Sequence, residues 1–369
     1  MRIKDFEFSL RELAGSMGDF GTLFPLAVGY IAICGMNPAG LLVMMGLTNI
    51  VTGIVYHLPM PLEPMKILAV MAIAKKWPPS LVYASAFGTG VVWLVLGLSG
   101  AIDRIAVLTP KPVTRGVQAA LGLLLAYQGL RMASTGWGLA ATSVAIIILF
   151  RQNRYAPAAI LLMALGLLVV WAKGELGPSV RLGFTPPPLT SFSPRQVWDA
   201  MVLAGFAQVP LTLTNAVIAA SALISRYFPG KPVSERRLAL NMGVMNVVVP
   251  FFGGMPMCHG AGGLAGQYFF GARTGGTNII EGLIEISLGL FLAGSIQQLF
   301  VVFPESVIGT MMFMVGLEMS KFAAEVRGWD LLPMGITIAL ALTTNMALGF
   351  AAGIAAQQTL RRLEARARA

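Results

Sequence analysis

The sequence is poor in charged residues, which make up 11% of its 369 residues, against roughly 25% in an ordinary soluble domain. Hydrophobic residues account for 56% of the chain. A soluble fold cannot bury that many apolar side chains and cover its surface with so few charges. The composition therefore excludes a water-soluble enzyme and a disordered chain, and it predicts a protein that crosses a lipid bilayer many times.

Cysteine and histidine are also scarce. Cys34 and Cys258 lie in apolar or glycine-rich surroundings and do not suggest a disulfide framework. The adjacent pair Cys258-His259 has no second pair at metal-ligand spacing, so we expect no metal and no cofactor. Motifs of zinc proteases, serine hydrolases and P-loop enzymes are missing from the sequence. The net charge of +10 is typical of cytoplasmic loops rich in Lys and Arg rather than of nucleic-acid binding.

Fourteen apolar stretches follow one another along the chain. A helix needs about 20 apolar residues to span the bilayer, and the third and tenth stretches are too short. We therefore predict an all-α polytopic membrane protein with about 14 transmembrane segments, of which segments 3 and 10 are half-helices. The stretches are 20–34, 39–57, 65–74, 80–98, 113–130, 137–150, 156–172, 198–224, 238–253, 261–271, 278–302, 305–324, 331–344 and 346–357.

A motif occurs twice with the same spacing, which indicates an internal repeat. Gly46-Leu-Thr-Asn49 precedes Pro59-Met60, and Gly243-Val-Met-Asn246 precedes Pro256-Met257. Seven segments per half is an odd number, so the second half must be inverted relative to the first. Inverted repeats with paired broken helices are typical of secondary transporters. The predicted parts are a first repeat (1–173), a Pro-rich linker (174–195), a second repeat (196–360) and a basic C-terminal tail (361–369).

The distribution of basic residues predicts the orientation. With the N-terminus inside, most Lys and Arg residues fall on the cytoplasmic side. Cytoplasmic loops carry this excess in membrane proteins. We therefore expect a multi-pass protein of the cytoplasmic (inner) membrane with both termini in the cytoplasm.

Two proline- and glycine-rich breaks precede the short segments. The first, His57–Lys66, contains three prolines that disfavour helix, and the second is Gly253–Gly263. Extended backbone inside a membrane is tolerated only where protein or a watery cavity covers it, and two such stretches could pair as short strands. Asn49 and Asn246 precede the breaks at matching places, where they either serve the site or pin the broken backbone.

Each break places a helix N-terminus near the middle of the membrane. Free N–H groups and the positive end of the helix dipole make such a terminus an anion site. Lys66 adds a positive charge, and the small residues Gly260–Gly263 allow a ligand to approach the backbone closely. The alternative is that these glycines only pack helices together. The predicted substrate-binding residues are Glu63, Pro64, Met65, Lys66, Gln208, Thr212, Cys258, His259, Gly260 and Ala261.

Acidic residues within membrane segments are candidates for proton transfer. Asp19 and Glu63 lie where a site is expected, and we predict that Glu63, and after it Asp19, carries protons. The alternative for Glu63 is a static ion pair with Lys66, three residues further on. Glu281 and Glu285 lie on one face of a later helix and are expected to be interfacial or paired.

Together, four motifs resemble those of the molybdate transporter family, which belongs to the sulfate permease superfamily. They are Gly18–Pro25, Pro59–Lys66, Pro210–Asn215, and Cys258–Tyr268 followed by Phe270–Arg273. The resemblance covers almost the whole membrane domain. It implies a seven-plus-seven inverted repeat with a core domain (segments 1–4 and 8–11) and a gate domain (segments 5–7 and 12–14). Glu63 departs from the pattern, since many relatives have Gln there.

The function that we predict is secondary active uptake of molybdate, coupled to protons and operating by alternating access. Sulfate and tungstate have the same shape and charge as molybdate, so the sequence leaves the choice among them open. An oxyanion channel on the same fold is a further alternative. The expected partners are the oxyanion, protons and the lipid bilayer, with no nucleic acid. The oligomeric state is open, with a homodimer among the alternatives.

Overall fold

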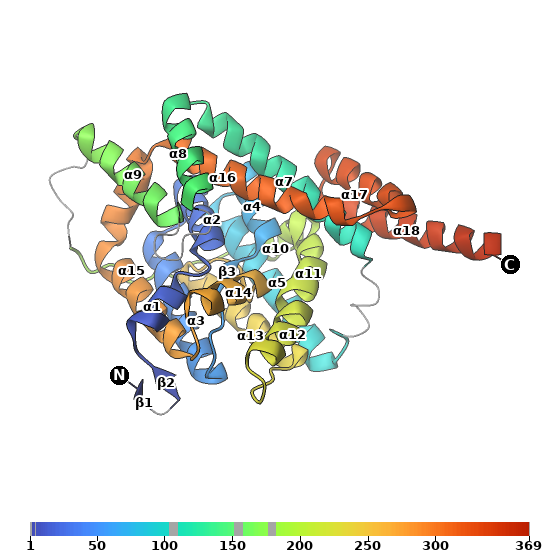
Figure 1. Ribbon diagram of the computed structural model, residues 1–369, viewed down its shortest axis with the longest axis horizontal. Coiled ribbons are helices and arrows are strands. Elements are labelled where there is room, and N and C mark those ends of the chain that lie inside the picture. The colour runs from blue at the N-terminus through green and yellow to red at the C-terminus, as the bar shows by residue number, and fades with distance from the viewer. Residues whose placement is uncertain (1, 4, 103–109, 151–157, 176–181, 369) are drawn as a thin grey trace.

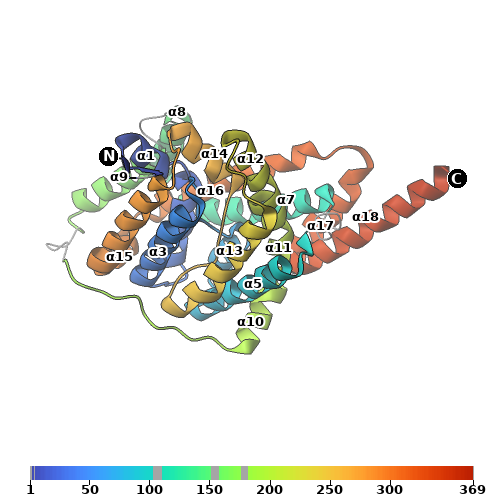
Figure 2. The ribbon, with the colours of Figure 1, turned by 90° about the horizontal axis from the view of Figure 1, so that it is seen from below.

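The computed structural model describes residues 2–3, 5–102, 110–150, 158–175 and 182–368, so part of the predicted linker, 176–181, lies outside the described residues. Almost all described segments are helices (Figures 1 and 2). The elements are β1 (Arg2–Ile3), β2 (Phe6–Glu7), α1 (Leu10–Ser16), α2 (Phe20–Ala32), α3 (Pro38–Tyr56), β3 (Glu63–Pro64), α4 (Lys66–Ala74), α5 (Pro79–Ser99), α7 (Lys111–Ala133), α8 (Trp137–Phe150), α9 (Ala158–Ala172), α10 (Pro194–Ala200), η1 (Met201–Gly205), α11 (Phe206–Thr212), η2 (Leu213–Ala219), α12 (Ala220–Tyr227), α13 (Glu235–Val248), η3 (Val249–Phe252), β4 (Met257–Cys258), α14 (Ala261–Phe270), α15 (Gly276–Val302), α16 (Glu305–Ser320), η4 (Lys321–Glu325), η5 (Gly328–Asp330), α17 (Leu331–Thr343) and α18 (Met346–Arg368).

Several helices are long and apolar enough to cross a membrane. Within the described residues these are Pro38–Tyr56, Pro79–Ser99, Pro194–Tyr227 and Gly276–Ile296. Shorter apolar helices accompany them, among them α8 and α16. Prolines near the first residue begin α3, α5 and α7, where the missing N–H group costs no helical hydrogen bond. The fold is thus that of a polytopic helical membrane protein.

The helices form two groups. In Figure 1, α7, α8, α9, α16, α17 and α18 lie along one side of the molecule, and we call them the flanking group. The remaining long helices surround β3 and α14, and we call them the central group. The C-terminal part of α18 projects beyond the rest of the molecule in both views (Figures 1 and 2).

Close helix pairs within each group depend on small residues. In the central group, α3 packs along α15 and α5 packs along α13, while α7 packs along α16 in the flanking group. A Cβ at Gly46 of α3 would lie 2.8 Å from the Ile286 side chain of α15, and one at Gly90 of α5 would lie 2.7 Å from the Asn246 backbone of α13. Glycine therefore sets how closely these helices approach, as is common between membrane helices.

The long stretch Pro194–Tyr227 is a continuous helix with two π-helical parts, η1 and η2, on either side of α11. Pro210 lies inside α11 and has no N–H group for the helical ladder. Departures of this kind within a helix are frequent at functional sites. The polar residues Gln208 and Thr212 lie on the part of the helix between the two π-helical parts.

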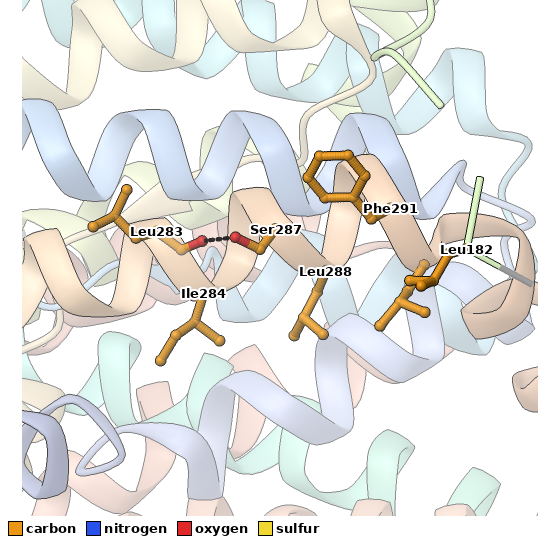
Figure 3. A pocket seen from close by; sticks show the side chains of 7 residues that line it. Leu182, Leu283, Ile284, Ser287, Leu288 and Phe291 are labelled. Carbon is orange, nitrogen blue, oxygen red and sulfur yellow. Dashed lines mark hydrogen bonds between the residues drawn. The ribbon is translucent and has the colours of Figure 1, made fainter. Parts of the chain in front are cut away.

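One helix face in the central group remains apolar and open. Leu283, Ile284, Leu288 and Phe291 of α15 line a shallow groove together with Leu182, and the Ser287 hydroxyl is turned back to the Leu283 carbonyl (Figure 3). Only 28% of the apolar 18-residue stretch within Gly276–Ile296 of α15 is buried inside the protein. In a membrane protein, such a face is suited to contact with lipid.

Candidate functional site

The two breaks meet at the centre of the molecule. Strands β3 and β4 pair in antiparallel fashion, with Glu63 opposite Cys258 and Pro64 opposite Met257. The Met65 N–H group extends the contact by donating to the Pro256 carbonyl at 2.9 Å. The predicted pairing of the breaks is therefore confirmed. It fixes the starts of the half-helices α4 and α14 next to each other, because each helix begins within three residues of its strand.

An asparagine holds each break in place. In the second, the Asn246 side chain accepts from Met257 N–H at 2.8 Å and donates to the Met257 carbonyl at 2.7 Å. In the first, Asn278 of α15 makes the same two bonds to Met60, at 2.9 and 2.6 Å. Asn49 then accepts from Asn278. The backbone-pinning role is therefore confirmed for Asn246, whereas Asn49 serves the first break only through Asn278.

At the N-terminus of α4, a side chain already engages the free N–H groups. The Gln208 side-chain oxygen accepts from Ile67 N–H at 2.7 Å and lies 3.4 Å from Leu68 N–H. The Gln208 amide nitrogen donates to the Thr212 hydroxyl at 2.7 Å. An amide oxygen thus lies at the place where this terminus would hold an oxygen of an anion. Both residues were predicted from the polar stripe, and the structure brings them to this helix end.

The N-terminus of α14 is lined by the Glu63 carboxylate. A Cβ at Gly260 would collide with that carboxylate, and one at Gly263 would lie 2.5 Å from its Oε1 atom. A Cβ at Gly262 would have no atom within 4 Å, and Gly262 is exposed. Gly260 and Gly263 therefore make room for a side chain of the protein itself. Only Gly262 has the open surroundings that we expected for all of these glycines.

Glu63 and Lys66 form an ion pair between the two helix ends. Lys66 Nζ lies 2.7 Å from Glu63 Oε2, with the Glu63 side chain 2% exposed and the Lys66 side chain 22% exposed. The static pair considered from the spacing is therefore present in this structure. Lys66 is the more exposed partner of the pair, whereas the Glu63 carboxylate is enclosed by protein.

Asp19 lies beside this pair, at the residue before α2. It is buried, and its Oδ2 atom lies 3.4 Å from the Gln267 amide nitrogen of α14. Gly18 allows the approach, because a Cβ there would collide with the Gln267 backbone. Asp19 Oδ1 and Gln267 Oε1 have no hydrogen-bond partner among the described residues. Asp19 thus lies near the site, as predicted, and its contact with Gln267 is a long hydrogen bond.

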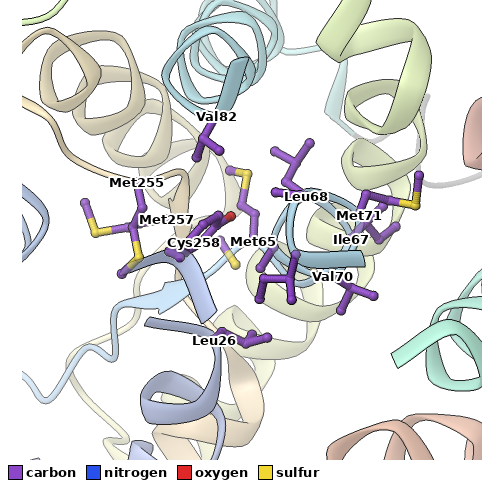
Figure 4. Close-up of a cluster of buried hydrophobic side chains, with 14 of the residues drawn as sticks. Leu26, Met65, Ile67, Leu68, Val70, Met71, Val82, Met255, Met257 and Cys258 are labelled. Carbon is purple, nitrogen blue, oxygen red and sulfur yellow. The ribbon is translucent and has the colours of Figure 1, made fainter. Parts of the chain in front are cut away.

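Other predicted binding residues have structural contacts. His259 is fully buried, with Nδ1 3.1 Å from the Pro61 carbonyl and Nε2 2.9 Å from the Asn241 side chain. Pro64 lies in β3 and Ala261 is the first residue of α14. The side chains of Met65 and Cys258 belong to a buried apolar cluster that surrounds the paired breaks (Figure 4). The contacts of His259, Met65 and Cys258 position the two helix ends.

The expectation that Glu281 and Glu285 are interfacial or paired holds only in part. Glu281 and Glu285 of α15 are 2% and 5% exposed, so they lie inside the protein rather than at its interface. Glu285 Oε2 accepts from Asn49 at 2.9 Å. The other Glu285 oxygen and both Glu281 oxygens have no partner among the described residues. The apolar neighbours of these acids along α15 were the available signal, because they made a polar interface improbable.

The arrangement of the helices matches that of solved anion transporters. The transmembrane domain of a cyanobacterial bicarbonate transporter, BicA, superposes with a TM-score of 0.70 at 17% identity, over 93% of this chain and 97% of that one. SLC26A9 superposes with a TM-score of 0.73 at 13% identity, over 99% of this chain and 66% of that one. Murine SLC26A9, an anion transporter solved in the inward-facing state, gives 0.69 at 14% identity, over 99% and 70%. The chain therefore has the fold of these anion transporters.

Sequence comparison is more specific. Residues 11–125 and 200–319 match the family described as "Molybdate transporter of MFS superfamily". Molybdate transporter 1 of Arabidopsis thaliana is 30% identical, over 94% of this chain and 87% of its own length. Molybdate transporter 1 of Chlamydomonas reinhardtii is 29% identical, over 93% and 90%. The chain belongs to the molybdate transporter family.

Proposed function

We propose that this protein is a secondary active transporter that takes up molybdate across the cytoplasmic membrane, with both of its termini in the cytoplasm. The observation that supports this most is the meeting of two half-helix N-termini, at α4 and α14, beside a lysine that is partly open to solvent. A small oxyanion needs N–H donors and positive charge; α14 and Lys66 supply them, and the α4 N–H groups become available when the Gln208 oxygen leaves them. Hydrogen bonds to a charged group contribute about 1.5–3 kcal/mol each, so a few of them suffice for micromolar affinity.

Glu63 acts in this proposal as an internal competitor of the substrate. Its carboxylate lies against the α14 glycines and pairs with Lys66. A dianion approaching Lys66 would be repelled by that carboxylate at a separation of a few ångströms. Protonation of Glu63 removes the repulsion and frees Lys66 for the oxyanion. Binding of the anion and of one proton are therefore coupled, and release to the cytoplasm reverses both steps.

The membrane potential sets the number of protons. An interior-negative potential opposes entry of each negative charge by about 2.3 kcal/mol per 100 mV, or roughly 4.6 kcal/mol for molybdate. At least two protons must enter with the anion to cancel this electrical work. Glu63 accounts for one of them, and Asp19, buried beside the pair, is the second candidate near the anion.

Movement between the two helix groups would provide alternating access. In inverted-repeat transporters, one bundle moves largely as a rigid body against the other. The central group contains both half-helix ends, whereas the flanking group carries none of the proposed binding residues (Figure 1). We therefore assign the central group as the core and the flanking group as the gate. Engineered cysteine cross-links between α2 and α16, which are in contact, should stop transport and leave binding intact.

Uptake into proteoliposomes tests the proposal. Labelled molybdate should accumulate inside vesicles when the outer solution is made acidic, and excess unlabelled molybdate should compete better than excess sulfate or tungstate. Preferential uptake of sulfate would reassign the substrate within the same fold. Molybdate-dependent currents without any pH-driven accumulation would indicate an oxyanion channel and contradict the proposal.

A further inference from the structure

From the buried acids of α15, we infer a second proton site, formed by Glu281 and Glu285, that lies apart from the anion site and carries a proton in each transport cycle. The inference rests on the proposed function, because it supplies a second proton for the uptake of a dianion. Asn278, Glu281 and Glu285 follow one another at helical spacing, so they share the face of α15 that packs on α3.

Most of the buried polar atoms at and beside this face that have no partner are hydrogen-bond acceptors. Among the described residues, none donates to either carboxyl oxygen of buried Glu281, and one oxygen of Glu285 likewise has no donor. Gln267 and Asp19 join α14 to the start of α2, and the part of the chain that the structure describes offers no donor to the Gln267 amide oxygen or to one Asp19 oxygen. A buried carboxylate without hydrogen bonds is strongly destabilised. A proton bound to one of these carboxyl groups would remove the costly buried charge.

Protons fit the site better than a metal cation. A cation would need several oxygen ligands at about 2.0–2.6 Å from one point. Among the described residues, no three Asp, Glu, His or Cys side chains lie close enough together to hold a metal ion. Separate protons on separate carboxyl groups do not need such convergence.

A comparison of the two corresponding helix pairs argues against a purely structural role. Asn246 of α13 pins its break by itself, and α5, against which α13 packs, carries no charged residue. In the other pair, α3 and α15, Asn278 of α15 makes the hydrogen bond to Met60 of the break. The amide of Asn49 instead donates to Glu285. The packing of these helices therefore does not require acids. Their presence on α15 alone points to a function.

Charged groups surround the acids on both sides. Towards the anion site, Asp19 interacts electrostatically with both acids and with the Glu63–Lys66 pair. Towards the start of α15, the buried Glu12 carboxylate accepts from the Thr277 hydroxyl, one helical turn before Glu281. Among the described residues, the elements with most contacts to α15 also carry Glu7 on β2 and Arg11 on α1, and Arg273 lies in the loop between α14 and α15. In each cycle a proton from the outer solution would bind a carboxylate oxygen of this site and leave it as a proton to the cytoplasm.

The test compares three isosteric variants in proteoliposomes. Glu281→Gln and Glu285→Gln remove the proton site, and a Gln at position 285 can still accept from Asn49. Glu305→Gln is the matched control, since Glu305 is an exposed acid at the start of α16. Labelled molybdate and an internal pH dye give the number of protons per anion. Molybdate counterflow, which needs no net proton movement, reports whether each protein is folded and binds substrate.

We expect counterflow in the wild type and in all three variants. The number of protons per anion should fall by one in Glu281→Gln or in Glu285→Gln, and it should not change in Glu305→Gln. Because one pH unit is worth about tenfold accumulation per coupled proton, accumulation under a one-unit gradient should fall about tenfold in the variant that loses the proton. An unchanged proton count in both variants overturns the inference but leaves the proposed function intact. Absence of molybdate counterflow in the wild type overturns the proposed function itself.

Infrared difference spectroscopy of the wild type keeps the inference testable where the variants do not fold. A protonated buried carboxyl group has a C=O stretching band distinct from that of a carboxylate. Titration should show at least two such bands in the wild type, one of which persists when both acids of the anion site are replaced, in the double variant Glu63→Gln, Asp19→Asn. Disappearance of every such band in that double variant would contradict a second proton site.

Discussion

Replacing Gly260 with Ala should destabilise the protein through contact with the Glu63 carboxyl group. The three atoms nearest to a Cβ at Gly260 all belong to the Glu63 carboxyl group, with Cδ at 2.7 Å and Oε1 at 3.0 Å. The backbone of Gly260 has φ −87° and ψ 127°, which alanine adopts without strain. Overpacking of this kind costs about 1–3 kcal/mol. The Glu63 carboxylate can yield only by giving up its 2.7 Å contact with Lys66.

A double-mutant cycle isolates this contact. Glu63→Ala alone should destabilise the protein by about 3–5 kcal/mol, the usual cost of leaving one partner of a buried ion pair alone, reduced by the partial exposure of Lys66. In that background Gly260→Ala should be nearly neutral, because the atoms that it meets are gone. The coupling energy is then about 1–3 kcal/mol in favour of the double variant, measured by unfolding in mixed micelles with increasing SDS. Equal costs of Gly260→Ala in both backgrounds would refute the placement of Glu63 at the α14 N-terminus.

Two further perturbations test other parts of the structure. Asn246→Ala removes both hydrogen bonds to Met257; at about 1–3 kcal/mol for each buried group left without a partner, the melting temperature should fall clearly, and an unchanged value would contradict the pinning of the second break. Burial acts to raise the pKa of Glu325, but hydrogen bonds and charges from Lys111 and Arg115 lower it overall. Its stabilising contribution is therefore complete above the ordinary pKa of a carboxyl group and lost as the pH falls through the lowered value, so the melting temperatures of the wild type and Glu325→Gln should converge in acid, and a constant difference would argue against this contact.

Much of the fold could be predicted from the sequence because its signals are local. Prolines 59, 61 and 64 disfavour helix wherever they occur, and the second copy of the motif showed that the two breaks correspond. Asp19, Gln208 and Thr212 stood out as polar residues in apolar segments. The structure brings all three to the helix ends or beside them.

The sequence could not reveal which residues, far apart along the chain, contact one another at the site. Small residues at Gly260 and Gly263 indicated a close approach but not what approaches, and the answer is a side chain of the other break. The spacing of Glu63 and Lys66 suited both a proton carrier and an ion pair. The contact of Asn278, in place of Asn49, with the first break is likewise a choice between distant partners that no local pattern encodes.

Equilibrium binding of labelled molybdate to purified Gly262→Val tests the central claim most directly, namely that the oxyanion binds at the half-helix N-termini. A Cβ at position 262 would meet no neighbouring atom within 4 Å, so the small Val side chain should leave the fold intact and obstruct the space in front of α14. Gly335→Val is the matched control, since a Cβ there on α17 also meets nothing within 4 Å. We predict at least about a tenfold loss of affinity in Gly262→Val, equivalent to about 1.4 kcal/mol, with wild-type affinity in the control. Wild-type affinity in a folded Gly262→Val protein would contradict the site.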